Sequence, residues 1–179
     1  MTPHESMALV DEILAPWRET IGADWDGYRN HVQRVARFCG ALSVAAPDTQ
    51  RKVAIAAAFH DLGIWSAGTM DYLPPSAALA RDYLHAHALD AWVPEIERMI
   101  LMHHRLRACG GPGDALVEAL RKADLVDLSL GFVPFGLDRA LVATVKKEFP
   151  NAGFHRRLAR LLAGRLRSHP ASPAPYLRW

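Results

Sequence analysis

The chain contains little cysteine, with only Cys39 and Cys109 among its 179 residues. Two cysteines are too few for a disulfide framework, and we interpret both as reduced thiols. Long apolar runs are also missing, since no stretch approaches the roughly 20 continuous apolar residues of a membrane-spanning helix. The N-terminal segment carries Glu5, Asp11 and Glu12 where a signal peptide has a basic and then an apolar run. These absences predict a cytoplasmic protein that does not enter a membrane.

Acidic residues are absent from positions 149–179, a segment that contains six arginines. A basic segment of this kind can bind nucleic acid or another anionic partner. Leucines recur between the arginines at helical spacing, however, as they do in a solvated amphipathic helix. We favour the solvated helix and expect no binding to nucleic acid at physiological ionic strength. The alternative is a helical nucleic-acid-binding module that keeps a vestigial metal site.

Strand-like alternation is also missing, and apolar residues recur at helical spacing almost throughout the chain. We therefore predict an all-α bundle of roughly seven to eight helices, folded as one domain over residues 1–168. Residues 169–179 form a Pro-rich tail that we expect to be extended. The expected helices cover residues 6–15, 25–46, 49–61, 76–88, 93–107, 114–130, 136–148 and 153–167. Gly63 suits a left-handed cap after the third of these helices, and the following stretch from 64 to 75 has the composition of a loop.

Ionisable side chains interrupt the apolar stripes at four positions. His60 and Asp61 lie side by side after an apolar stretch, while His31 and Asp124 fall on the inward stripes of two other expected helices. One buried histidine is more often a core residue than a ligand, but buried aspartates beside imidazoles are costly without a neutralising cation. Two imidazoles and two carboxylates without a thiolate favour one divalent ion, such as manganese, iron, cobalt, nickel or magnesium, over a structural zinc. The sequence therefore predicts a metal centre.

The ordered set of His31, His60-Asp61 and Asp124, within residues 25–130, resembles the HD superfamily of metal-dependent phosphohydrolases. The resemblance implies hydrolysis of a phosphate ester, with a nucleotide or another small phosphorylated metabolite as the substrate. The alternative is a non-hydrolytic HD enzyme, either a di-iron oxygenase or a hydratase. Members with two metals usually carry another histidine near the start of the preceding helix, and residues 72–78 contain none. This absence argues against the oxygenase, although a second metal ion and the oligomeric state are left open.

Two adjacent histidines, His103 and His104, lie near the end of another expected helix, with His103 on its inward face. The resemblance places a second metal or contacts to phosphate in this region of the chain. We therefore predict that His103 and His104 line the site and act in catalysis together with Asp61. The source of proton transfer is left open among Asp61, a metal-activated water molecule, Asp71 and Asp127.

Cations near a metal stabilise a phosphoryl oxygen, and Arg34 and Lys122 are the predicted phosphate-binding residues. Arg34 lies one turn from His31, and Lys122 lies near Asp124 in the sequence. Arg105 is a further candidate, together with the adjacent histidine. Each of these cations has an alternative role as a surface or ion-pair residue. The side chains of the 64–75 stretch that can cover the core or stack on a substrate are Trp65, Met70 and Tyr72.

Overall fold

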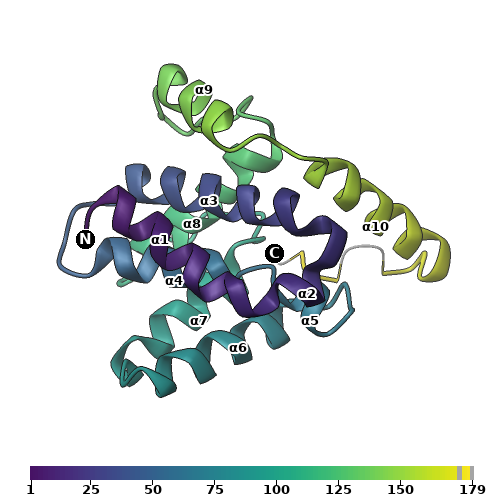
Figure 1. Cartoon of the computed structure of the whole chain (residues 1–179), viewed down its shortest axis with the longest axis horizontal. Coiled ribbons are helices and arrows are strands. Elements are labelled where there is room, and N and C mark those ends of the chain that lie inside the picture. Colours follow the sequence, from purple (N-terminus) through teal and green to yellow (C-terminus); the bar gives the residue numbers. More distant parts are fainter. Residues whose placement is uncertain (173–174, 178–179) are drawn as a thin grey trace.

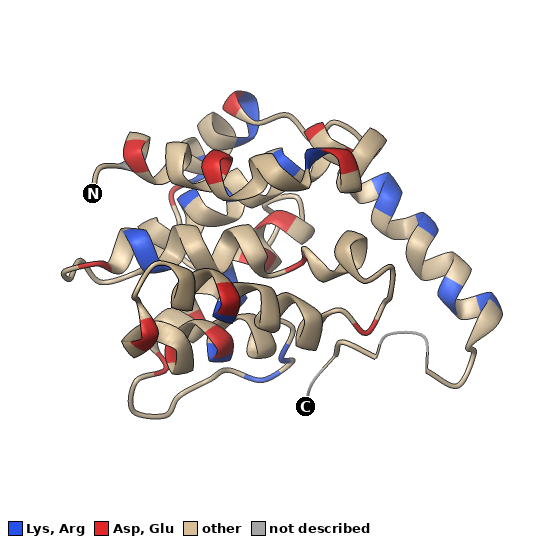
Figure 2. Ribbon diagram, turned by 60° about the horizontal axis from the view of Figure 1, so that its bottom comes forward, with Lys and Arg blue, Asp and Glu red and all other residues tan. Residues whose placement is uncertain are grey.

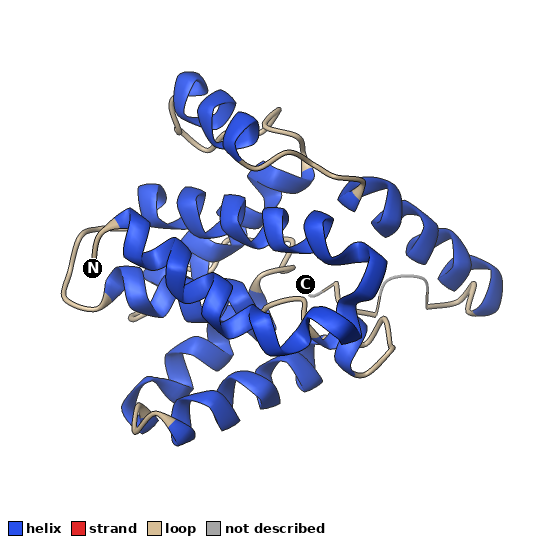
Figure 3. Ribbon diagram, viewed as in Figure 1, coloured by secondary structure: helices blue, strands red, loops and turns tan. Residues whose placement is uncertain are grey.

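The structure is a computed structural model of the chain and describes residues 1–172 and 175–177. The part of the chain that it describes is all-α and contains no β-strand (Figure 3), which confirms the predicted fold class. The long helices are α1 (Pro3–Leu14), α3 (Trp25–Leu42), α4 (Thr49–Phe59), α6 (Leu73–Ala86), α7 (Val93–Met102), α8 (Ala115–Leu128), α9 (Arg139–Glu148) and α10 (Phe154–Ser168). The short elements are α2 (Arg18–Ile21), α5 (Gly63–Ser66) and three 3₁₀ turns at 15–17, 22–24 and 90–92.

The long helix α3 forms the centre of the bundle, where it packs along α8 on one side and α4 on the other (Figure 1). Its inward stripe consists of Tyr28, Val32, Val35 and Phe38, each with an exposed fraction of 0%. These residues recur at spacings of three and four, so one face of the helix is apolar over its whole length. Helix α1 covers α3 and α4, and the α6–α7 pair packs against α4 and α8. Among the described helices, none is long and apolar enough to cross a lipid bilayer.

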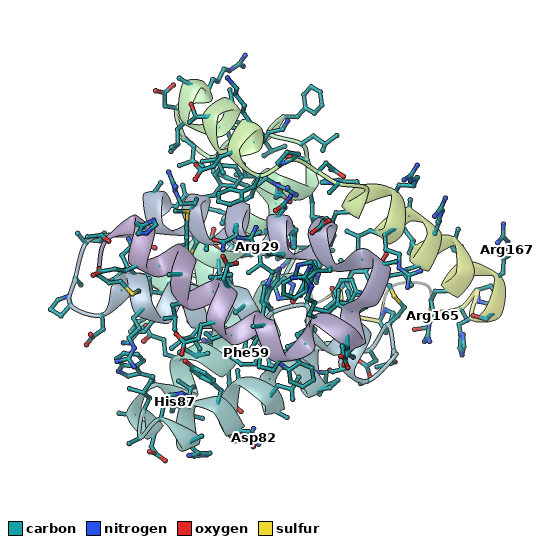
Figure 4. All side chains as sticks on the ribbon, in the orientation of Figure 1. Arg29, Phe59, Asp82, His87, Arg165 and Arg167 are labelled. Atoms are coloured by element: carbon teal, nitrogen blue, oxygen red, sulfur yellow. The ribbon has the colours of Figure 1, made fainter. Side chains whose placement is uncertain are left out.

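Helix α10 extends along one side of the bundle, and its charged residues are all basic, as the blue segments of its ribbon show (Figure 2). Figure 4 shows Arg167 at the far end of this helix, extended away from the bundle. Arg157 is partly exposed, and its Nε lies 2.8 Å from Oδ2 of Asp24, an ion pair that ties α10 to the start of α3. The absence of nucleic-acid binding stays a prediction.

Several helix boundaries differ from those expected from periodicity. Helix α1 begins at Pro3 rather than at residue 6, because Thr2 and Glu5 form a capping box in which each side chain accepts a hydrogen bond from the other residue's backbone N–H. Helix α7 ends at Met102 rather than at 107, which places the two adjacent histidines in the turn that follows. The expected loop over 64–75 is wrong at both ends, because it contains most of α5 and the first turn of α6.

The expected left-handed cap at Gly63 is wrong, because Gly63 begins α5 and is not among the glycines with positive φ. A Cβ atom at this position would clash with the carbonyl oxygen of Tyr72 and lie 2.9 Å from Oγ of Ser76. The Gly63 N–H donates a hydrogen bond of 2.9 Å to that same hydroxyl. Glycine is therefore required for the close approach of α6 to the chain directly after His60 and Asp61.

We expect Gly63→Ala to lower the free energy of unfolding by about 2–3 kcal/mol, because the added methyl group must displace a backbone carbonyl. Gly164→Ala is the matched control, since Gly164 lies within α10 and a Cβ there meets open space. The control is expected to raise stability by up to about 1 kcal/mol through helix propensity. Urea denaturation of both variants measures the difference, and equal effects of the two substitutions would contradict this explanation.

Candidate metal centre

Three segments bring the four predicted ligands together. His31 lies within α3, His60 and Asp61 lie in the turn after α4, and Asp124 lies on α8. All four side chains are buried. Nε2 of His31 lies 3.0 Å from Nε2 of His60, 3.7 Å from Oδ2 of Asp61 and 3.6 Å from Oδ1 of Asp124. The four residues therefore direct their polar atoms toward one point in the core.

Three histidine rings are oriented by hydrogen bonds on the side away from this point. In each ring Nδ1–H donates to an oxygen 2.7 Å away: His31 to the Asp127 carboxylate, His60 to the Ala57 carbonyl and His103 to the Ile100 carbonyl. These oxygens only accept, so Nδ1 carries the proton whenever a ring is neutral, and Nε2 of each ring then presents a lone pair to the centre. The same arrangement fixes the ring orientation of metal-binding histidines in known sites.

Phe154, the first residue of α10, stacks on the ring of His31 with the ring centroids 4.0 Å apart. This contact closes the centre on the side of α3 and excludes water from that ligand. The remaining access is from the side of His103 and His104, where the end of α7 meets α8.

Asp61 contacts two groups of side chains at once. Its Oδ2 faces His31 and His60 at 3.7 and 3.6 Å, while its Oδ1 lies 3.3 Å from Nε2 of His103. Asp124 is divided in the same way, because its Oδ1 faces the first two histidines and its Oδ2 lies 3.6 Å from Nδ1 of His104. The structure thus brings His103 and His104 to the predicted site, as the sequence pattern suggested.

Three buried polar atoms in this cluster have no hydrogen-bond partner: Oδ1 of Asp61, Oδ1 of Asp124 and Nε2 of His103. An unsatisfied buried acceptor costs about 1–3 kcal/mol, and more when it is charged. Such atoms are rare in native proteins, and their concentration at one point requires an explanation. A cation between them would give all three atoms a partner.

The shifted pKa values of His31 and Asp61 indicate that the cluster favours positive charge. Burial lowers the pKa of His31, but the carboxylates of Asp127, Asp61 and Asp124 outweigh it and raise that pKa to about 9. Burial raises the pKa of Asp61, and the surrounding histidines, first His60, reverse this effect and hold it well below the ordinary value. A proton on His31 can therefore neutralise part of the cluster. Burial lowers the pKa of His103 as well, but Asp61 outweighs it and raises that pKa, so a proton on Nε2 of His103 would face Oδ1 of Asp61 at 3.3 Å. Oδ1 of Asp124 gains no partner from either proton.

The donor set fits a divalent ion with a preference for mixed nitrogen and oxygen ligands. Two imidazoles and two carboxylates suit manganese, iron, cobalt, nickel or magnesium, the ions expected from the sequence. His31, His60 and Asp61 offer ligand atoms that lie within 4.8 Å of one another, and so do Asp61, His103 and His104. The shared carboxylate of Asp61 therefore leaves room for one ion or for two.

His104 has a partner of its own, since its Nε2 shares a hydrogen bond of 2.6 Å with the hydroxyl of Tyr72. Burial raises the pKa of Tyr72 well above 10, so the hydroxyl keeps its proton. Burial, and then the nearby His103, lower the pKa of His104 to about 3, which keeps the ring neutral. When Tyr72 donates, Nδ1–H of His104 points toward Asp124 and serves as a proton donor. The opposite tautomer would free Nδ1 for a second ion.

A cavity of about 360 Å³ opens above the centre, and its floor includes Asp61, His103, His104 and Asp124. The C-terminal tail forms part of its wall, because the ring of Tyr176 lies 4.8 Å from that of His104. The tail was expected only to be extended; of its residues, 173–174 and 178–179 lie outside those described. Its contact with the site was missed, since a single tyrosine in a Pro-rich segment has no periodicity that points toward the core.

The predicted phosphate-binding residue Arg34 does not lie at the cavity. Arg34 is 2% exposed and holds the carboxylate of Asp127 through Nε at 2.5 Å and Nη2 at 2.8 Å. It also donates to the carbonyl of Phe149 at 2.9 Å. Because Asp127 in turn accepts from Nδ1 of His31, Arg34 lies behind the ligand and away from the cavity. Its role is to support the centre from outside.

Lys122 does not line the cavity either; its Nζ lies 3.5 Å from the carboxylate of Glu118. The cations that do line it are Arg105, which the sequence offered as a candidate, and Arg121, which it missed. Arg121 precedes Asp124 by three positions on α8, so helical spacing placed both on one face. Its Nε and Nη2 each donate to Glu118 at 2.8 Å.

The candidates for proton transfer are now fewer. Asp127 is bound on both oxygens by Arg34 and His31, and Asp71 is exposed and does not line the cavity. Of the three carboxylates considered, only Asp61 faces the cavity. His87 directly follows the last residue of α6 (Figure 4), and it is exposed.

Comparisons of the chain with protein-family models, with curated proteins and with solved structures found no match. The features that bear on function are the buried cluster, the cavity above it and the order of the candidate ligands along the sequence.

Proposed function

We propose that this protein is a metal-dependent hydrolase of phosphate esters of the HD type, in which His31, His60, Asp61 and Asp124 hold one divalent ion. The observation that carries the proposal is the set of unpartnered buried atoms at the floor of an open cavity. A structural metal site is closed by its protein ligands, whereas a catalytic site keeps a position open toward solvent or substrate. The cavity above Asp61 and Asp124 supports the catalytic alternative.

When bound, the ion would polarise a phosphoryl oxygen and lower the pKa of a water molecule. Residues of the chain would transfer the protons of the reaction. Asp61 lines the cavity, so its carboxylate oxygen that does not hold the ion would accept the proton of an attacking water molecule. His103, whose Nε2 lies 3.3 Å from Oδ1 of Asp61, orients this carboxylate. His104 is held by the hydroxyl of Tyr72, and its Nδ1–H would turn from Asp124 to the leaving oxygen of a bound substrate. Arg121 at the wall attracts the anionic substrate.

The proposal is tested by purifying the protein without chelators, measuring its metal content and assaying a panel of phosphate monoesters. We expect about one ion per chain and hydrolysis that stops when the ion is removed. We expect His103→Ala to keep the ion and to lower kcat by about 100-fold, because Asp61 then loses the neighbour that orients it for proton transfer. His87→Ala is the control, since this histidine is exposed at the end of α6, and it should change neither quantity.

The group formed by Asp61, His103 and His104 favours a second candidate, a two-metal enzyme such as the di-iron oxygenases of the same superfamily. Two ions per chain, with one lost in His103→Ala, would contradict the one-metal proposal and support this alternative. The substrate class of the protein would then have to be sought among oxidisable compounds.

A further inference from the structure

The cavity above the metal centre has a polar floor and apolar walls. The polar side chains Asp61, His103, His104 and Asp124 meet at its base, where they belong to the centre. The walls come from the α5–α6 loop region, the turn after α7, the outer face of α8, helix α10 and the tail. Their apolar residues are Ile64, Met70, Leu106, Leu125, Leu128, Leu158, Ala159, Leu162 and Leu177.

Two polar side chains on the walls, Arg121 and Tyr72, already have partners within the protein. The guanidinium of Arg121 donates to both oxygens of Glu118, and the hydroxyl of Tyr72 shares a hydrogen bond with His104. A sugar or glycerol group in this cavity would therefore bury its hydroxyls against leucine and methionine side chains. Such hydroxyls lose hydrogen bonds to water without replacement, which opposes binding.

An apolar group in the same cavity is favoured, whereas a sugar is disfavoured. Apolar surface is stabilised when it leaves water for the leucine-lined walls, and this gain grows with each methylene group. The volume of about 360 Å³ lies at the small end of the range for ligand pockets, about 300–1,000 Å³. Tyr176 and Leu177 of the tail limit the outer end, so a compact group fits better than a long chain.

We propose that the substrate is a phosphate monoester of an apolar alcohol, with a short alkyl or an aryl group held by the leucine-rich walls and the phosphate at the polar floor. The inference rests on the proposed function for the phosphate, but the apolar preference arises from the walls alone. The proposed substrate class excludes nucleotides and sugar phosphates.

A matched series of substrates tests the proposal on the full-length, metal-loaded protein. From methyl to butyl phosphate, kcat/KM should rise about fourfold per methylene group. Glycerol 3-phosphate has the carbon skeleton of propyl phosphate with two added hydroxyls, and we expect it to react at least tenfold more slowly. Phenyl phosphate should be preferred over a nucleoside 5′-monophosphate. Equal kcat/KM values for propyl phosphate and glycerol 3-phosphate would overturn the inference while leaving phosphohydrolysis intact.

Two variants of α10 test whether the walls cause the preference. Leu162→Asn places an amide on the wall and should reduce the ratio of propyl to glycerol phosphate kcat/KM by at least fivefold. Leu166→Asn, one turn further along, is the control, because Leu166 is 49% exposed and is not among the lining residues. The ratio should not change in this control. A wild-type ratio in Leu162→Asn would contradict the assignment of the wall.

Binding separates failure of the inference from failure of the proposed function. Calorimetric titration with methyl-, propyl- and phenylphosphonate measures the apolar preference without any turnover. If no monoester is hydrolysed but affinity still increases from methyl- to propyl- and phenylphosphonate, the pocket inference stands and hydrolysis is excluded. If affinity is the same for all three phosphonates, the apolar preference is excluded even where hydrolysis is observed.

Discussion

Asp124→Ala is expected to lower the metal content of the purified protein from about one ion per chain to near zero. Oδ1 of Asp124 lies 3.6 Å from Nε2 of His31 and 3.8 Å from Nε2 of His60, so its removal takes away one of the four converging groups. The exposed fraction of Asp124 is 1%, and Phe154 closes the centre beside His31. A ligand at this depth is poorly replaced by water, and elemental analysis after gel filtration measures the loss.

His85→Ala is the matched control for this experiment. His85 is exposed and pairs with Asp90 at 2.6 Å, outside the cluster, so its removal should leave the metal content unchanged. Asp124→Asn adds a second comparison, because the amide keeps the volume of the side chain but removes its charge, and it too should lose most of the ion. Full metal retention in Asp124→Ala would remove the central claim of a metal centre at these residues.

Arg34→Met is expected to lower the free energy of unfolding by about 3–5 kcal/mol, the usual cost of removing one partner from a buried ion pair. Arg34 and Asp127 are 2% and 3% exposed, and two hydrogen bonds join them. Burial raises the pKa of Asp127, but His31 and Arg34 outweigh it and keep the carboxylate ionised. The variant would therefore leave Asp127 charged with only His31 as its partner, and urea denaturation measures the cost.

Arg37→Met, one turn further along α3, is the control for the effect of Arg34. The Arg37 guanidinium lies 3.5 Å from Glu148 in a partly exposed pair, and such pairs contribute about 0–1 kcal/mol. Combining Arg34→Met with Asp127→Asn removes the isolated charge, so the double variant should recover part of the stability. A loss in Arg34→Met no larger than in Arg37→Met would show that the buried pair is not the support of His31 that the structure indicates.

The core of the fold was predictable because it depends on local periodicity. The apolar stripe of α3 identifies the face on which His31 lies, and the stripe of α8 does the same for Asp124. How each helix packs against the others depends on contacts between distant segments and cannot be read from local periodicity. Ionisable residues on inward faces, however, need polar partners in the core, and the other buried ionisable residues are the partners at hand. Their convergence at one centre therefore followed from the sequence once all helices were placed.

The errors arose where a partner from a distant segment decides the outcome. Arg34 is close to His31 in sequence, but its role is determined by Asp127 of α8 and by the carbonyl of Phe149, which periodicity on α3 does not reveal. Gly63 has an ordinary position after a helix, and only the carbonyl of Tyr72 across the turn shows why no side chain fits. Tyr176 reaches the cavity through a tail whose direction no pattern specifies.

The distance along the chain between the ligands has a consequence for the order of folding. His31 binds Asp127 across 96 positions, and the centre is complete only when α3, the turn after α4 and α8 have docked. Contacts between distant segments form late, because closing a long loop costs entropy before any contact compensates for it. We therefore expect an ion held by these residues to bind after the helices have assembled, so that it does not direct the assembly. Metal uptake during refolding would then report the last step of folding, and compact molecules with α8 undocked would bind no ion.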